Sequence, residues 1–318
     1  TGQAGEPGKS FSVVALGVAG GLNEQNLSSF LIAPAGSTDF VALDAGSVLG
    51  GIKKGLEKGS FSGVTPAGNV SPEGSILQSN IKGYLISHAH LDHISGLVIG
   101  SPDDSSKVIM GLESTIKSIE ENIFNEKTWP NFGDSGAGFN IKKYHYVKLA
   151  PDQEVAMTGS SMMVRPFPLS HGKNFVSTAY LLKSGEAYFL YLGDTGPDEV
   201  EKSENLKKLW TAVAPLVKSK ALKGMIIEVS FPNDKPDNQL FGHLTPKWLM
   251  KELHNLASAV DSTGKENVLK DFSIAVTHMK PSFIKGANPE ETIKKELADG
   301  NDLGVKLLFP DQGDRLEF

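Results

Sequence analysis

Three histidines and one aspartate fall within the six residues "HAHLDH", His88 to His93. The whole chain has only eight histidines, so this stretch concentrates them. His88 and His90 are separated by one residue, and in an extended strand such side chains lie on the same side. Asp92 and His93 follow where we expect the chain to turn into a helix. The spacing can therefore present two histidines to one metal ion and an Asp–His pair to a neighbouring ion.

Imidazole and carboxylate ligands suit Zn²⁺ or a similar divalent metal in a catalytic site with an open coordination position. The alternative is a polar turn with ordinary surface histidines. Four ligand-type residues in six positions, directly after an apolar run, favour the metal site.

Three more ligand-type residues end apolar strands elsewhere in the chain. His171 lies in "FPLSHGKN", Asp194 in "YFLYLGDTG" and His278 in "FSIAVTHMKP". A carboxylate at the end of a strongly apolar strand is costly to bury unless it faces a cation. Each residue taken alone could instead be a capped loop residue or a hydrogen-bonded core histidine. Three strands that end in this way favour a shared two-ion site in which one carboxylate is a bridge.

The elements that position these residues are short strands and amphipathic helices. We expect a mostly β-structured first half, with a long surface loop over 50–80 around a short helix, and then alternating helices and strands. Two sheets covered by helices on both outer faces would satisfy this pattern. Strands are expected in "FSVVALGV", "SSFLIAP", "DFVALDAG", "IKGYLIS", "YHYVKLA", "MMVRPFPLS", "STAYLLKS", "AYFLYLGD", "LKGMIIEVS", "FSIAVTHMK", "GVKLLF" and "DRLEF". Helices are expected in "STIKSIEENIF", "VEKSENLKKLWTAVAPLV", "TPKWLMKELHNLASAV" and "NPEETIKKELA".

The composition limits the partners. A hydrophobic content of 39% and a net charge of −6 describe a globular, mildly acidic protein, which argues against a nucleic-acid polymer as partner. No apolar run is long enough to span a membrane. The absence of cysteine excludes disulfides and thiolate sites and suits a periplasmic or secreted protein, with the cytoplasm as the alternative. We expect residues 1–10 to form a flexible lead.

The motifs "SHAHLDHISGL", "LSHG", "LGDTG" and "VTHMKP" resemble the metal motifs of metallo-β-lactamase-fold hydrolases. The longer stretches "HAHLDHISGLVIGSP", "ENIFNEKTWPNF" and "LFGHLTP" make the chain most similar to the class II 3′,5′-cyclic nucleotide phosphodiesterases. The similarity runs from about Phe11 to the end. It implies an α/β (α+β) fold of the four-layer αββα type, two β-sheets flanked by helices, as one catalytic domain over 11–318.

The resemblance also implies two divalent metal ions, with zinc as the first expectation and manganese or iron as alternatives. It divides seven ligands into two groups that share one carboxylate. One ion is held by His88, His90 and His171, the other by Asp92, His93 and His278, and Asp194 bridges them.

Further residues receive roles from the same likeness. The related tRNA-processing nucleases carry a Glu–His pair after the bridging Asp, so we expect Glu228 to orient His243, which would face the phosphate and the leaving oxygen. We assign catalysis to Asp92, Glu228 and His243. A strand-end salt bridge for Glu228 and a loop role for His243 are the alternatives.

The stretch "ENIFNEKTWPNF" contains the candidates for a nucleobase pocket. We expect Trp129, Asn131 and Asn125 to bind the base, because a purine stacks well on an indole. The alternative is a Trp–Pro corner packed in the core.

These assignments predict hydrolysis of cAMP, cGMP or both to 5′-nucleoside monophosphates by a hydroxide bridging the two metals. The alternatives are a tRNase Z-like RNA phosphodiesterase and another hydrolase of the same fold. The expected partner is then a small cyclic nucleotide. We expect no membrane partner, and homodimer formation is left open.

Overall fold

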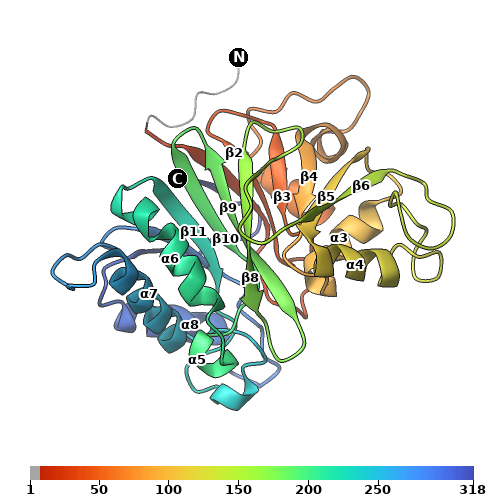
Figure 1. The fold of residues 1–318 in the computed structure, drawn as a ribbon. Coiled ribbons are helices and arrows are strands. Elements are labelled where there is room, and N and C mark those ends of the chain that lie inside the picture. Colours follow the sequence, from red (N-terminus) through yellow and green to blue (C-terminus); the bar gives the residue numbers. More distant parts are fainter. Residues whose placement is uncertain (1–7) are drawn as a thin grey trace. The chain divides into compact units, whose positions relative to one another are not determined.

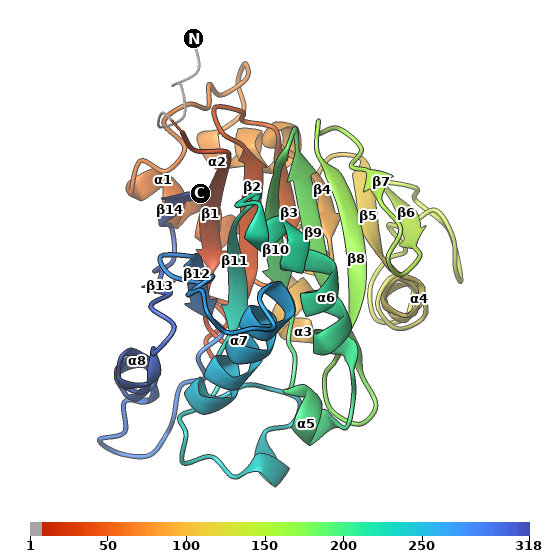
Figure 2. The same cartoon turned by 60° about the vertical axis from the view of Figure 1, so that its left-hand side comes forward.

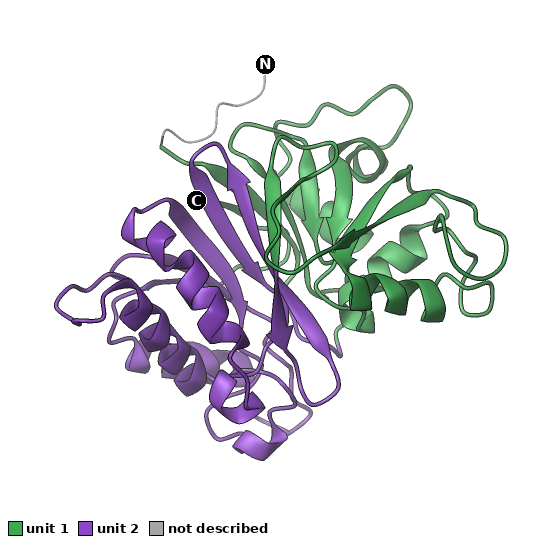
Figure 3. Ribbon diagram, in the orientation of Figure 1, with its two compact units in different colours: residues 1–18, 23–166, 310–318 green, residues 19–22, 167–309 purple. Residues whose placement is uncertain are grey.

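The chain folds into two compact units in the computed structural model, which describes residues 8–318. Unit 1 comprises the described part of 1–18 together with 23–166 and 310–318, and unit 2 comprises 19–22 and 167–309 (Figure 3). Most of the predicted lead over 1–10 lies outside the described residues. The prediction of a single domain over 11–318 stays a prediction.

Unit 1 is built on a mixed seven-stranded sheet (Figure 1). Neighbouring strands are antiparallel from β14 to β3 and parallel from β3 to β6. Because β3 and β4 are parallel neighbours, their carboxyl ends lie at the same edge of the sheet, where ligand sites of such sheets form. The strand order is β14 (Arg315–Glu317), β1 (Phe11–Gly17), β2 (Ser29–Pro34), β3 (Phe40–Leu43), β4 (Ile81–Leu85), β5 (Lys107–Leu112) and β6 (Tyr144–Leu149).

Helices pack on this sheet through apolar faces. Ile94 and Leu97 of α3 and Ile116 and Ile119 of α4 are three residues apart, the spacing of one helix face, and all four join the buried core of unit 1. The helices are α1 (Leu49–Glu57), α2 (Pro72–Ser75), the π-helical η1 (Ile76–Asn80), α3 (Leu91–Gly100) and α4 (Glu113–Asn122).

Unit 2 is built on the second mixed sheet, whose strands β10 to β13 are parallel while β9 and β10 are antiparallel. The parallel strands place the ends of β10, β11 and β12 at one edge. The sheet order is β13 (Lys306–Leu308), β12 (Ser273–Thr277), β11 (Leu222–Glu228), β10 (Ala187–Leu192), β9 (Val176–Ser184) and β8 (Met163–Ser170), and β8 begins in unit 1, where it pairs with β7 (Val155–Ala156).

Alternate residues of the unit 2 strands face its helices. Met225 and Ile227 of β11 join a buried core with Leu209 and Trp210 of α6 and Leu253 of α7. Figure 2 shows α6 and α7 over this sheet. The helices are α5 (Asp198–Glu201), α6 (Asn205–Lys218), the 3₁₀ turn η2 (Asp237–Gln239), α7 (Pro246–Val260) and α8 (Pro289–Gly300).

The sequence-based expectation for 50–80 was wrong in part, and so was that of a mostly β-structured first half. Helices α1, α2 and η1 occupy much of 49–80, and α3 and α4 follow. The glycines inside α1 made its sequence look like a loop, because glycine is a poor helix former. Gly51 is nevertheless required there, since a Cβ at this position would lie 2.1 Å from the carbonyl oxygen of Leu16. The helix thus lies unusually close to β1.

A buried ion pair ties β5 to the rest of unit 1. The Asp104 carboxylate contacts Lys107 Nζ at 2.7 Å and accepts hydrogen bonds from the hydroxyls of Tyr84 and Tyr144 at 2.7 and 2.8 Å. Burial and the nearby carboxylate raise the pKa of both tyrosines, so both hydroxyls stay protonated and donate. Burial lowers the pKa of Lys107, which the carboxylate opposes.

Substituting Asp104→Asn should therefore destabilise the fold strongly, because it leaves a buried ammonium without its counter-charge. We expect the free energy of unfolding in urea to fall by about 3 kcal/mol or more. Glu57→Gln, which removes an exposed pair with Lys54, is the control and should change it by less than about 0.5 kcal/mol. A loss at Asp104 no larger than that of the control would contradict the assignment.

Candidate metal centre

The end of β4 and the start of α3 position the predicted ligands of unit 1. His88 and His90 follow the strand, and Asp92 and His93 lie in the first turn of the helix. Asp92 is well placed there because a carboxylate is stabilised by the positive end of the helix dipole. The predicted turn from strand to helix is thus confirmed.

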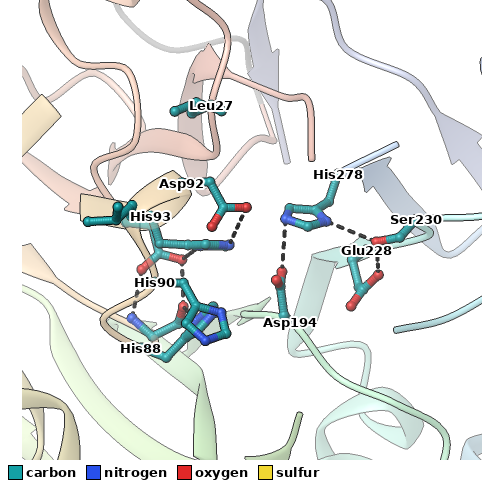
Figure 4. Close-up of polar contacts among 12 residues, drawn as sticks. Leu27, His88, His90, Asp92, His93, Asp194, Glu228, Ser230 and His278 are labelled. Atoms are coloured by element: carbon teal, nitrogen blue, oxygen red, sulfur yellow. Dashed lines mark hydrogen bonds and ion pairs between the residues drawn. The ribbon is translucent and has the colours of Figure 1, made fainter. Parts of the chain in front are cut away.

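The four side chains lie together in unit 1 (Figure 4). Nε2 of His88 lies 3.0 Å from Nδ1 of His90, and Nε2 of His93 lies 3.8 Å from a carboxylate oxygen of Asp92. The rings of His88 and His93 are 4.3 Å apart between centroids. Two ring nitrogens lie close together, and so do a ring nitrogen and a carboxylate oxygen, as the predicted ligand pairs require.

Asp44, at the end of β3, was missed by the sequence analysis. It is fully buried, and its backbone has a positive φ of 55°, which is uncommon outside glycine. Its carboxylate accepts hydrogen bonds from His93 Nδ1 at 2.8 Å and from the backbone N–H of Ser87 at 2.7 Å. The residue therefore orients a predicted ligand. The signal was present, because "FVALDAG" is another apolar strand that ends in Asp.

In unit 2 the predicted residues again lie at strand ends. Asp194 follows β10, Glu228 ends β11 and His278 follows β12, so the parallel order brings them to one edge of the sheet. His171 directly follows β8. His278 has a positive φ of 65°, a conformation that in non-glycine residues is concentrated at functional sites.

Asp194 lies between two histidines of unit 2. Its Oδ1 is 3.3 Å from Nε2 of His278, as Figure 4 shows, and its Oδ2 is 3.7 Å from Nε2 of His171. The carboxylate is only 3% exposed. Its two oxygens therefore face different predicted ligands, and Oδ2 also lies 3.9 Å from Nδ1 of His243.

Glu228 and His243 form the predicted pair. His243 Nδ1 lies 2.8 Å from Glu228 Oε1, and both residues are buried. Burial, and then the charge of Asp194, raise the pKa of Glu228 to about 7. The two carboxylates thus create an excess of buried negative charge that a cation would relieve.

The backbone carbonyl of Gly242 orients His171, a further predicted ligand, since its oxygen lies 2.9 Å from Nδ1 of that ring. Gly242 has a φ of +78°, and a Cβ there would lie 2.1 Å from the backbone nitrogen of Gly172, so only glycine fits. Burial lowers the pKa of His171 and favours the neutral imidazole that a metal requires.

The donor set fits a divalent metal. In unit 2, ligand atoms of His171, Asp194 and His243 lie within 4.8 Å of one another, and so do those of Glu228, His243 and His278. Imidazole nitrogens and carboxylates without thiolate suit zinc, manganese or iron. The types and the closeness of these ligand atoms support the prediction of a divalent metal site. The overlap of the two groups means that distance alone does not separate a ligand role for His243 from a catalytic one.

The predicted base-binding residues have local partners in unit 1. Trp129 Nε1 donates to Ser101 Oγ at 3.0 Å. The Asn131 side chain is fully buried and bonded to three backbone groups of its own loop, and Asn125 accepts from the backbone N–H groups that follow it. These bonds stabilise the loop, and a role in base binding stays a prediction.

The two sheets and the histidine–carboxylate clusters define a metal-dependent hydrolase of the metallo-β-lactamase fold. The structure of YhfI from Bacillus subtilis, a metallo-β-lactamase fold protein, matches with a TM-score of 0.62 at 16% identity, covering 98% of this chain and 100% of that one. The predicted fold class is therefore confirmed. No helix in the described part of the chain has the length and apolar character needed to cross a membrane.

The chain belongs to the family of class-II cAMP phosphodiesterases, whose model matches residues 11–313. It is 48% identical over 312 residues to the 3′,5′-cyclic-nucleotide phosphodiesterase of Aliivibrio fischeri, covering 97% of this chain and 93% of that protein. The Yersinia pestis protein named "Probable 3′,5′-cyclic-nucleotide phosphodiesterase" is 45% identical over 311 residues, with coverages of 97% and 90%. The structure of unliganded yeast PDE1 matches with a TM-score of 0.83 at 25% identity, covering 98% of this chain and 100% of that one. The resemblance inferred from the motifs is confirmed.

Proposed function

We propose that this protein hydrolyses 3′,5′-cyclic nucleotides to 5′-nucleoside monophosphates with two divalent metal ions. The family supplies the reaction, since the matched relatives are named for it. The ligand sets are those of the motifs: His88, His90 and His171 for one ion, Asp92, His93 and His278 for the other, and Asp194 for both.

The orientation of Asp194 is the observation that carries this proposal. Its two oxygens point to His171 and His278, which the motifs assign to different ions. A carboxylate in this orientation can bridge two cations. When bound, a metal pair neutralises phosphoryl oxygens and makes water a better nucleophile.

His243 and Glu228 would handle the leaving group. With Nδ1 bonded to Glu228, the ring of His243 is held in one orientation, and its Nε2 would face the substrate. A proton on Nε2 would pass to the departing 3′ oxygen, and Glu228 would stabilise the charged ring before that transfer. This assigns positioning to Glu228 and proton donation to His243.

The finer properties follow from the ligand types and the composition. Zinc is the proposed metal, with manganese and iron as alternatives. We place the protein in the periplasm or outside the cell, with the cytoplasm as the alternative, because a chain without cysteine suits an oxidising compartment. A homodimer is compatible with every feature above.

The test is metal analysis of the purified protein followed by assays on cAMP, cGMP and a precursor tRNA. We expect about two metal ions per chain, hydrolysis of a cyclic nucleotide to the 5′-monophosphate, and loss of activity with a chelator that metal restores. The rate should depend only slightly on salt, because a mononucleotide contacts few charged groups.

Two outcomes would contradict the proposal. Cleavage of the precursor tRNA with a steep salt dependence, and none of cAMP or cGMP, would favour the RNA phosphodiesterase. Full activity after complete removal of metal would exclude the metal mechanism.

A further inference from the structure

Each unit contains a buried serine that links a carboxylate to a histidine. In unit 1 the serine is Ser87, directly before the histidine cluster, and in unit 2 it is Ser230, two residues after Glu228. Both side chains are fully buried. The sequence analysis assigned a role to neither.

In unit 1 the chain of hydrogen bonds runs from Asp44 through Ser87 to His88. Ser87 Oγ lies 2.6 Å from Asp44 Oδ2 and 3.0 Å from His88 Nδ1. The same Asp44 oxygen also accepts directly from His93. One carboxylate therefore holds two histidines, one directly and one through the serine.

Unit 2 repeats this arrangement with other residues. Ser230 Oγ lies 2.5 Å from Glu228 Oε2 and 2.9 Å from His278 Nδ1 (Figure 4). The other oxygen of Glu228 bonds His243 directly. Glu228 is also held by the backbone N–H of Thr195 at 3.0 Å. The carboxylate is therefore fixed by several hydrogen bonds, and it orients the ring of His243 directly and the ring of His278 through Ser230.

The direction of these bonds follows from counting hydrogens. A serine hydroxyl has one hydrogen, and in both units it is donated to the carboxylate, that of Asp44 in unit 1 and that of Glu228 in unit 2. Its oxygen must then accept from Nδ1–H of the histidine. His88 and His278 are therefore held as the tautomer protonated on Nδ1, which leaves the Nε2 lone pair for a cation.

We propose that Ser87 and Ser230 are positioning residues that fix the tautomer of His88 and of His278 and so set the affinity of the metal that each histidine binds. This inference rests on the proposed function, because the two histidines are assigned there to different ions. Each serine should accordingly affect one metal site more than the other.

Two measurements test this inference. In metal-free protein, ¹⁵N NMR of the imidazoles should show a proton on Nδ1 of His278, and Ser230→Ala should lower the occupancy of that proton. Ser87→Ala should do the same to His88. Titration of the metal-free protein with Zn²⁺ should then show one of two binding steps weakened about 10- to 100-fold in each variant. Threonine at either position keeps the hydroxyl and should restore binding.

Ser177→Ala is the matched control. Ser177 lies fully buried in β9, and among the described residues its hydroxyl has no hydrogen-bond partner. This variant should keep both binding steps and both tautomers. If an alanine variant does not fold, cysteine at the same position keeps the volume and weakens the hydrogen bond, and the same shift is expected.

The outcomes separate this inference from the proposed function. The serine roles alone would be overturned if the wild-type protein binds two ions and hydrolyses cAMP, while the folded serine variants have the same histidine tautomers and the same Zn²⁺ affinities as the wild type. Wild-type protein that binds no metal would overturn both.

Discussion

Alanine at position 194 should abolish the hydrolysis of cyclic nucleotides and reduce the metal content below two ions per chain. Asp194 is buried, and its two oxygens face His171 and His278, so no neighbouring water can easily replace both contacts. Metal ions contribute several kcal/mol of transition-state stabilisation, and losing one lowers kcat/KM by about 10³-fold or more. The measurements are metal analysis and steady-state kinetics with cAMP.

Two variants make this result interpretable. Asp194→Asn keeps the shape but removes the charge, so it should also lose metal, whereas a merely structural residue would tolerate it. Asp302→Ala removes an exposed carboxylate that pairs with His254 in the same unit, and it should retain two ions and full activity. Full activity and two ions in Asp194→Ala would refute the bridging role.

The part of the candidate site that lies at strand ends could be predicted from the sequence. Apolar runs that end in His or Asp led to the prediction of His171, Asp194 and His278 as ligands, and the parallel strands β10 to β12 show why residues at strand ends meet at one edge in unit 2. The same criterion applied to "FVALDAG" would have found Asp44.

The serines could not have been found in this way. Ser230 contributes through a bond to His278, which is 48 residues away along the chain. That contact depends on the register between β11 and β12, where Glu228 pairs with Thr277. A single sequence does not show which residues of neighbouring strands pair with each other. Serine is also a common residue, so its presence alone does not indicate a role. Positioning residues of this kind become visible only when neighbouring strands are placed.

Helix α1 shows a second limit of the sequence. Its glycines indicate a loop by their intrinsic preference, but Gly51 is selected by the close approach of the helix to β1. Tertiary packing here overrides local propensity. The loop over 124–140 is a similar case, because the buried side chain of Asn131 forms bonds that stabilise the loop and that composition alone does not indicate.

The second large effect is expected at His243, whose replacement by alanine should leave both metal ions in place and slow turnover. Nδ1 of this histidine lies 2.8 Å from Glu228 Oε1, and this contact orients the ring whose Nε2 we assign to the substrate. Loss of a general acid lowers kcat by about 10²- to 10⁴-fold. Metal analysis and kinetics on cAMP measure the two effects separately.

The leaving group gives the sharper measurement. A p-nitrophenyl phosphodiester releases a phenolate that needs no proton, so His243→Ala should lose far less activity on it than on cAMP. His254→Ala is the control, because His254 is an exposed residue of α7 in the same unit, and this variant should match the wild type on both substrates.

His243 also lies close enough to His171 and Asp194 to be a ligand, so the experiment decides between two chemistries. If His243 binds metal, the alanine variant loses an ion and both substrates slow equally, because the nucleophile is affected whatever the leaving group. If His243 donates a proton, the ions remain and the loss depends on the leaving group. The bond to Glu228 orders Nε2 for either role, because a metal-binding histidine also donates its other ring N–H to a carboxylate, so the metal content of the variant decides between them.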